Sequence, residues 1–202
     1  MMNQYGNLLM GKNEVEYVIN SLNEDDIMLE WGSGGSTYTF SKLVKKYYSI
    51  EHSAAWYGKV VNTLKNKNIN NVEMHHVDIH AMKYDSYLDL HAEQVFKRYP
   101  SFKKDDDITY ATTRDRDLDW HHFIDYINKI KTFDIKFDKI FIDGRARAMC
   151  AFLSLNYIKD DGIVYIHDFG SRDYYKSVLD FYRIEDEISG DWPGSLVALK
   201  KI

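Results

Sequence analysis

Three side chains that could move a proton or hold a metal ion stand directly after two apolar runs. Asp143 follows residues 137–142, and His167 and Asp168 follow residues 162–166. Apolar runs of this length are typical of buried parallel strands, whose carboxyl ends meet at one edge of a sheet. An imidazole with its ordinary pKa can act as a general base, and a carboxylate pair with an imidazole can also ligate a divalent ion. We therefore expect the three residues to form one catalytic cluster, with either chemistry open.

A second candidate site is the glycine-rich stretch at residues 26–37, which follows another short apolar run. Glycines let the backbone turn sharply and approach a ligand, and a helix that begins there offers unpaired N–H groups. The spacing departs from the dinucleotide pattern, and an acidic residue before the first glycine suits a ligand with a positive end. The residues expected to bind a cofactor here are Glu30, Gly32, Ser33, Gly34, Ser36 and Thr37.

Acidic residues also follow the next two apolar runs of the chain. Glu51 comes 19 residues after Gly32, a spacing at which a carboxylate can accept hydrogen bonds from both hydroxyls of a ribose. His52 adjoins it, and Asp78 closes the following run. We expect all three near the cofactor, although an aspartate such as Asp78 serves equally well as a helix N-cap.

The segments between these residues alternate between strand and helix patterns. Residues 183–202 hold two strand-like runs separated by a short turn at 190–194, which predicts an antiparallel hairpin. The alternating segments and the hairpin together predict an α/β, Rossmann-like, doubly wound sheet of seven strands with the last strand antiparallel. The expected strands are 27–29, 47–50, 71–77, 137–142 and 162–166, and the expected helices are 12–22, 36–46, 54–67, 118–131, 146–158 and 173–182.

One long stretch, residues 80–116, lacks clear periodicity. We expect residues 1–202 to form a single domain in which this stretch is an insertion on the acceptor side, because long irregular loops on a rigid scaffold often carry specificity. The candidate substrate-binding residues are Tyr110, Arg114, Trp120 and Arg145.

Composition narrows the class of partner. The chain has 202 residues, a net charge of −5 and an estimated pI of 5.9, so it has no overall attraction for nucleic acid. We expect no membrane insertion, because no apolar run approaches the length of a membrane span and no signal peptide opens the chain. Cys150 is the only cysteine, which indicates a reducing, cytoplasmic compartment.

The glycine-rich stretch resembles motif I of the class I S-adenosylmethionine (SAM) dependent methyltransferases, and the order of strands and helices is the one expected of that family. The resemblance covers most of the chain outside residues 80–116. It implies that Glu30 lies near the amino-acid part of SAM, that Glu51 holds the ribose and that Asp78 lies near the adenine.

The resemblance also bears on the methyl acceptor. Base-methylating enzymes carry Pro-Pro after the fourth strand, where this chain reads Asp-Gly-Arg-Ala at 143–146, and Cys150 is not preceded by proline. Catechol-type and sugar O-methyltransferases hold Mg²⁺ or Mn²⁺ with residues at the positions of Asp143, His167 and Asp168. Their fifth-strand pair is usually Asp-Asp or Asp-Asn, so His167 is a departure that slightly favours a base over a metal ligand.

The sequence Phe-Ile-Asp-Gly-Arg-Ala-Arg at 141–147, with the later His-Asp pair, resembles small methyltransferases of surface-glycan synthesis, including domains of chlorella-virus glycan-assembly proteins. That implies a sugar or glycan acceptor, such as the deoxyhexose rhamnose, and host cytoplasm for a viral protein. Two alternatives stay open: an NAD-dependent oxidoreductase, and a catalytically silent SAM-fold interaction module.

Overall fold

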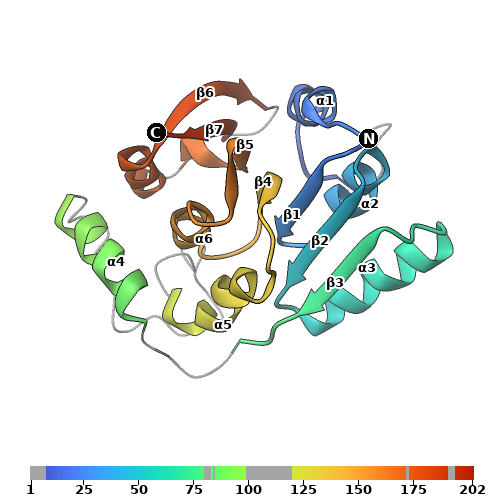
Figure 1. Cartoon of the computed structure of the whole chain (residues 1–202), viewed down its shortest axis with the longest axis horizontal. Coiled ribbons are helices and arrows are strands. Elements are labelled where there is room, and N and C mark those ends of the chain that lie inside the picture. Colours follow the sequence, from blue (N-terminus) through green and yellow to red (C-terminus); the bar gives the residue numbers. More distant parts are fainter. Residues whose placement is uncertain (1–7, 80–82, 84, 99–119, 172, 191–193) are drawn as a thin grey trace.

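The computed structural model describes residues 8–79, 83, 85–98, 120–171, 173–190 and 194–202. They build one seven-stranded sheet in the order β3-β2-β1-β4-β5-β7-β6 (Figure 1). The first five strands are parallel, whereas β7 is antiparallel to both β5 and β6, so the predicted fold class is confirmed. The strands are β1 (Ile27–Trp31), β2 (Lys46–Glu51), β3 (Val72–His76), β4 (Phe137–Ile142), β5 (Ile158–Ile166), β6 (Tyr182–Ser189) and β7 (Ser195–Lys201).

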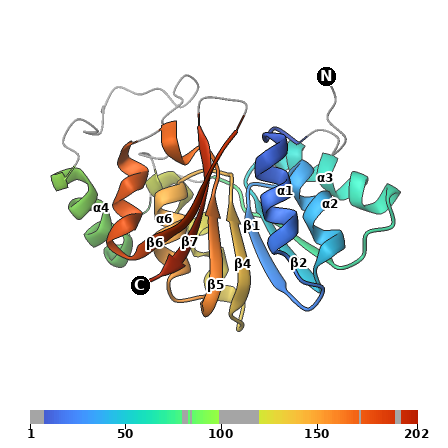
Figure 2. The ribbon, with the colours of Figure 1, turned by 90° about the horizontal axis from the view of Figure 1, so that it is seen from above.

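Helices cover both faces of the sheet (Figures 1 and 2). On one side lie α1 (Lys12–Ser21), α2 (Gly35–Phe40) and α3 (Ala54–Asn66). On the other side lie α4 (Ser86–Arg98), α5 (Ile124–Asn128) and α6 (Arg147–Ser154). Short 3₁₀ segments complete the connections at Ser41–Leu43, Trp120–Phe123, Lys129–Thr132, Phe169–Ser171 and Asp173–Asp180.

Strand alternation divides the core in two. Met28 and Tyr47 face α1 and α2, whereas Leu29 and Trp31 pack toward α5 and α6. Because both faces of the central strands are buried, these strands read as nearly continuous apolar runs. None of the helices in the described parts of the chain is long and apolar enough to cross a membrane.

The structure differs from the sequence-based expectation in several elements. The helix expected at 36–46 ends at Phe40 and continues only as the 3₁₀ segment Ser41–Leu43, and the helix expected at 173–182 is the 3₁₀ segment Asp173–Asp180. The strand expected at 162–166 begins at Ile158, because an irregular pairing beside β4 accommodates the polar residues after it. The helix expected at 118–131 is split into two 3₁₀ segments around α5. A helix, α4, occupies part of the stretch that showed no periodicity, and Tyr110 and Arg114 lie outside the described residues.

Candidate active site

A cavity of about 440 Å³ opens at the carboxyl ends of β1, β2 and β4. This size falls within the range of small-molecule sites, and the position is where α/β sheets bind ligands. It is lined by Leu8, Leu9, Gly32, Ser33, Gly34, Gly35, Ser36, Glu51, His52, Ser53, Trp56, Asp143, Gly144 and Arg145. The predicted glycine turn, Glu51, His52, Asp143 and Arg145 are therefore brought together.

The glycine turn depends on close contact between two backbones. Gly32 has a φ of 94°, and its amide donates to the Ile50 carbonyl at 2.9 Å. A Cβ added to Gly32 would lie 2.5 Å from the Cα of Gly144. No other residue fits at Gly32 without moving the loop after β4.

Glu51 joins the glycine turn to the end of β2. Its carboxylate accepts the Ser33 amide at 2.9 Å and the Ser53 amide at 2.7 Å, and His52 Nδ1 lies 3.1 Å away. Burial by itself would raise the pKa of Glu51, but the bonds from His52 and the two amides outweigh it and hold the pKa below its ordinary value. The cavity wall therefore carries an ionised carboxylate at the predicted ribose position.

Glu30 does not face the cavity, contrary to our expectation of a cofactor contact. It is fully buried and accepts hydrogen bonds from the Ser36 hydroxyl, from Thr37 Oγ1 at 2.6 Å and from Ser49 Oγ at 2.7 Å. Thr37 Oγ1 in turn accepts the Gly34 amide at 2.8 Å. Glu30 thus positions the glycine turn from beneath, because strand alternation points it into the sheet face that α2 covers.

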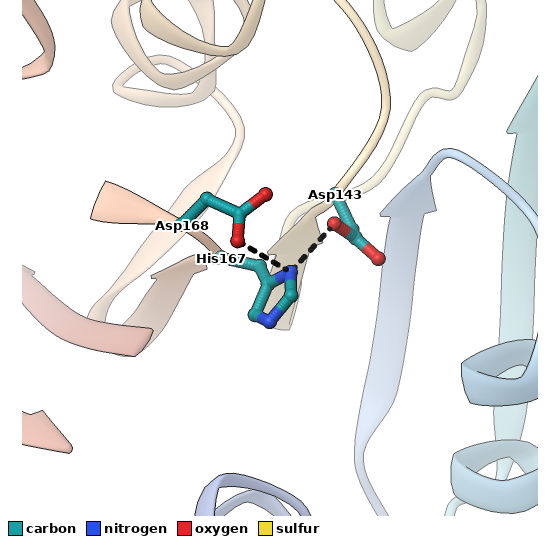
Figure 3. A group of neighbouring side chains, drawn as sticks. All are labelled: Asp143, His167 and Asp168. Atoms are coloured by element: carbon teal, nitrogen blue, oxygen red, sulfur yellow. Dashed lines mark hydrogen bonds and ion pairs between the residues drawn. The ribbon is translucent and has the colours of Figure 1, made fainter. Parts of the chain in front are cut away.

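Asp143, His167 and Asp168 lie together in one cluster at the ends of β4 and β5, as predicted from their positions after the two apolar runs (Figure 3). His167 Nδ1 lies 2.9 Å from Asp143 Oδ1 and 3.7 Å from Asp168 Oδ1. On the other side of the ring, Nε2 lies 3.5 Å from Oε2 of the buried Glu14 of α1. Both ring nitrogens therefore face carboxylates.

This arrangement argues against His167 as a general base. Burial lowers the pKa of His167, but the neighbouring Asp143, Glu14 and Asp168 raise it by more, so that the pKa is about 10. The ring is an imidazolium at neutral pH and has no free nitrogen to accept a proton. Its charge also holds the pKa of Asp143 below its usual range, against the effect of burial.

Arg147 is the second cation of the cluster, and no role was predicted for it from the sequence. It is 5% exposed, and its Nη1 lies 3.2 Å from Asp168 Oδ2 while Nη2 lies 3.3 Å from Asp143 Oδ1. It also donates to the backbone carbonyls of Asp143 at 3.0 Å, Gly144 at 3.1 Å and His167. One side chain thus ties the loops after β4 and β5 together.

A divalent ion on Asp143, His167 and Asp168 does not fit these surroundings, although one ligand atom from each residue lies within 4.8 Å of the others. An ion there would stand roughly 4–5 Å from the guanidinium, where a +2 and a +1 charge repel by about 7 kcal/mol at an effective dielectric constant of about 20. It would also have to displace the proton of an imidazolium with a pKa of about 10. The predicted Mg²⁺ or Mn²⁺ site is not supported by the donor set.

The remaining predicted residues are scattered. Asp78 is exposed and does not line the cavity, and its Oδ1 accepts the Ile79 amide at 2.9 Å. Trp120 is 1% exposed within the hydrophobic core, so it cannot serve as an acceptor wall in this conformation. Sequence reasoning missed Glu14, because an acidic residue on an amphipathic helix carries no signal of the sheet edge it will reach.

No protein-family model matches the chain, and no curated protein sequence matches it. Solved structures do match. A methyltransferase-like protein from Silicibacter pomeroyi DSS-3 shares 20% identity over 96% of this chain and 87% of its own, with a TM-score of 0.62. A putative methyltransferase from Streptococcus mutans, solved with SAH, shares 14% identity over 93% and 95%, with a TM-score of 0.56. An rRNA methylase from Streptococcus thermophilus shares 13% over 93% of both chains, with a TM-score of 0.57.

The fold is that of the Rossmann-like methyltransferases. At these identities the likeness concerns the arrangement of strands and helices, and a fold of this kind hosts many chemistries.

Proposed function

We propose that this protein is a SAM-dependent methyltransferase that modifies a hydroxyl group of a sugar or glycan. The observation that carries the proposal is the cavity at the ends of β2, β1 and β4, which combines a glycine turn, an ionised Glu51 and Asp143. A structural neighbour with the same fold was solved with SAH, which supports SAM as the ligand.

The cofactor would occupy the part of the cavity at the ends of β1 and β2. The turn at Gly32–Gly34 allows close approach of the methionine end, and Glu51 has lone pairs left to accept ribose hydroxyls. Trp56, which is 42% exposed, donates its indole N–H to the Ser33 carbonyl and so places an aromatic face at the cavity wall. When bound, SAM supplies an electrophilic methyl group on its sulfonium and leaves as a neutral thioether.

Asp143 is the residue proposed to take the hydroxyl proton. It lines the cavity, its side chain is 27% exposed, and its carboxylate stays ionised beside His167 and Arg147. A carboxylate with a low pKa is a weak base, but it suffices here because the acceptor oxygen becomes strongly acidic once it carries the methyl group. His167 and Arg147 then position Asp143 rather than take the proton themselves.

Arg145 is the residue proposed to orient the acceptor. It lines the cavity, and its buried Nε has no hydrogen-bond partner among the described residues. A guanidinium offers several donors in one plane, which suits the neighbouring hydroxyls of a sugar. The apolar side chains of Leu8 and Leu9 line the same cavity and would suit the methyl group of a deoxyhexose such as rhamnose.

Nucleic acid is a weaker candidate for the acceptor. Structural neighbours include an rRNA methylase. This chain, however, has a net charge of −5, whereas proteins that bind nucleic acid rely on basic surfaces to neutralise phosphates.

The proposal is tested by incubating the protein with SAM and a saccharide panel that includes rhamnosides, with an RNA arm, and by measuring methyl gain by mass spectrometry. We expect a methylated saccharide, and we expect Asp143→Asn to slow its formation by about 10²–10⁴. Asp160→Asn is the matched control, since Asp160 is 92% exposed beside Lys201. Methyl gain in RNA alone, or none in any acceptor by a protein that binds SAM, would refute the sugar assignment.

A further inference from the structure

We infer that the Arg147 guanidinium takes the place of a divalent cation at the ends of β4 and β5, so that this site excludes metal and its cation is part of the chain. Arg147 is a positioning residue in this account: it holds Asp143 and Asp168 in place and does not touch the reacting atoms.

The contacts of Arg147 are those expected of a bridging cation. Its two terminal nitrogens reach one carboxylate each, Asp168 at 3.2 Å and Asp143 at 3.3 Å. The same side chain also donates to three backbone carbonyls of the two loops. A planar fork with five N–H donors can satisfy all of these acceptors, which a lysine ammonium with three donors cannot.

Two residues next to the Arg147 side chain have a left-handed backbone conformation. Arg147 is the first residue of α6, and the preceding Ala146 adopts a left-handed conformation with a φ of 52°. Asp168, on the facing loop, is left-handed as well, with a φ of 58°. Non-glycine residues adopt this conformation uncommonly, and here both positions flank the same guanidinium.

The cluster already holds a cation without an ion. Glu14, Asp143 and Asp168 contribute three carboxylates around the His167 ring, and the Arg147 guanidinium adds a permanent positive charge within 3.3 Å of Asp143 and Asp168. A guanidinium stays protonated at all physiological pH values, so this cation can be neither chelated nor exchanged. Removing Arg147 should expose the carboxylate pair and create the metal site that it now excludes.

The test is Mn²⁺ binding, followed by electron paramagnetic resonance, in the wild type and in Arg147→Met. We expect no stoichiometric site in the wild type at millimolar Mn²⁺. We expect Arg147→Met to bind one ion at least about tenfold more tightly than the wild type binds any. Adding Asp143→Asn to Arg147→Met should abolish the gained site. Arg147→Lys should gain nothing, since it keeps the charge, and Arg183→Met is the matched control for an exposed arginine.

Two results would overturn the inference: a wild-type protein that binds one Mn²⁺ and loses it with Asp143→Asn, or a folded Arg147→Met protein with no gain. Arg147→Gln, which keeps donors but not charge, serves if Arg147→Met does not fold. If neither variant folds, the melting temperature of the wild type is measured with and without Mn²⁺. A rise with Mn²⁺ that is absent in Asp143→Asn would refute the inference that this site excludes metal. No SAM or acceptor is present, so the outcome is independent of the proposed function.

Discussion

At the scale of single residues, Glu30 combines full burial with three hydroxyl donors. Burial raises the pKa of Glu30 to about 7, from an ordinary 4.5, by more than the hydrogen bonds lower it. The folded state therefore holds this proton more tightly than the unfolded state does. Its contribution to stability is fully present below pH 4.5 and is lost as the pH rises through about 7.

We predict that Glu30→Gln removes this pH dependence. Between pH 4.5 and about 7, the wild-type free energy of unfolding should fall by up to about 3 kcal/mol from this residue alone, whereas the variant should lack that component. The Ser36, Thr37 and Ser49 hydroxyls can rotate to accept from the new amide, so the variant should fold. Urea denaturation over this pH range makes the comparison, and parallel curves for the two proteins would contradict it.

His167 should stay charged far into the alkaline range, because three carboxylates surround it. Its pKa of about 10 lies above its ordinary 6.5, so its contribution to stability is fully present below pH 6.5 and is lost as the pH rises through about 10. ¹⁵N NMR of the imidazole should show a protonated ring at pH 8. A neutral ring at that pH would restore His167 as a candidate base and weaken the case for Asp143.

At the scale of elements, the contact between the β1 and β4 loops should be the least tolerant of substitution. We predict that Gly32→Ala costs about 2–4 kcal/mol of stability, because it combines a strained positive φ with a Cβ that meets the Gly144 backbone. Gly58→Ala is the matched control. Gly58 lies within α3 and its Cβ would meet nothing within 4 Å, so alanine there should stabilise the protein by about 0.5–1 kcal/mol.

Thermal and urea denaturation of both glycine variants provide the measurement. A Gly32→Ala protein as stable as the wild type would show that the two loops can separate freely, and the cavity wall would then not be fixed as described.

The sequence predicted which loops meet but not which way their side chains point. Glu51, Asp143 and His167 were found because each follows an apolar run, and parallel strands bring such positions together. Glu30 was misplaced because strands buried on both faces lack the alternation that reveals orientation. The partners of His167 were equally hidden, since Glu14 lies on another element and Arg147 reaches back across two loops.

At the scale of the whole molecule, the sheet order explains how one cavity draws on distant parts of the chain. Strands β2, β1 and β4 are neighbours in the sheet, so the residues after them share one edge despite their separation in sequence. This arrangement fits a nucleoside cofactor placed across β1 and β2 and an acceptor placed at β4. We therefore propose that the cavity binds SAM and its product through Glu51.

Calorimetric titration with S-adenosylhomocysteine tests this proposal. We predict one bound molecule per chain for the wild type. For Glu51→Ala we predict a binding free energy weaker by about 1–3 kcal/mol, because loss of the carboxylate leaves the ribose hydroxyls unpaired. Glu73 lies on the edge strand β3, where its side chain is 45% exposed beside Lys46, and Glu73→Ala should bind like the wild type. A folded wild type that does not bind S-adenosylhomocysteine, or a Glu51→Ala protein with unchanged affinity, would contradict the account.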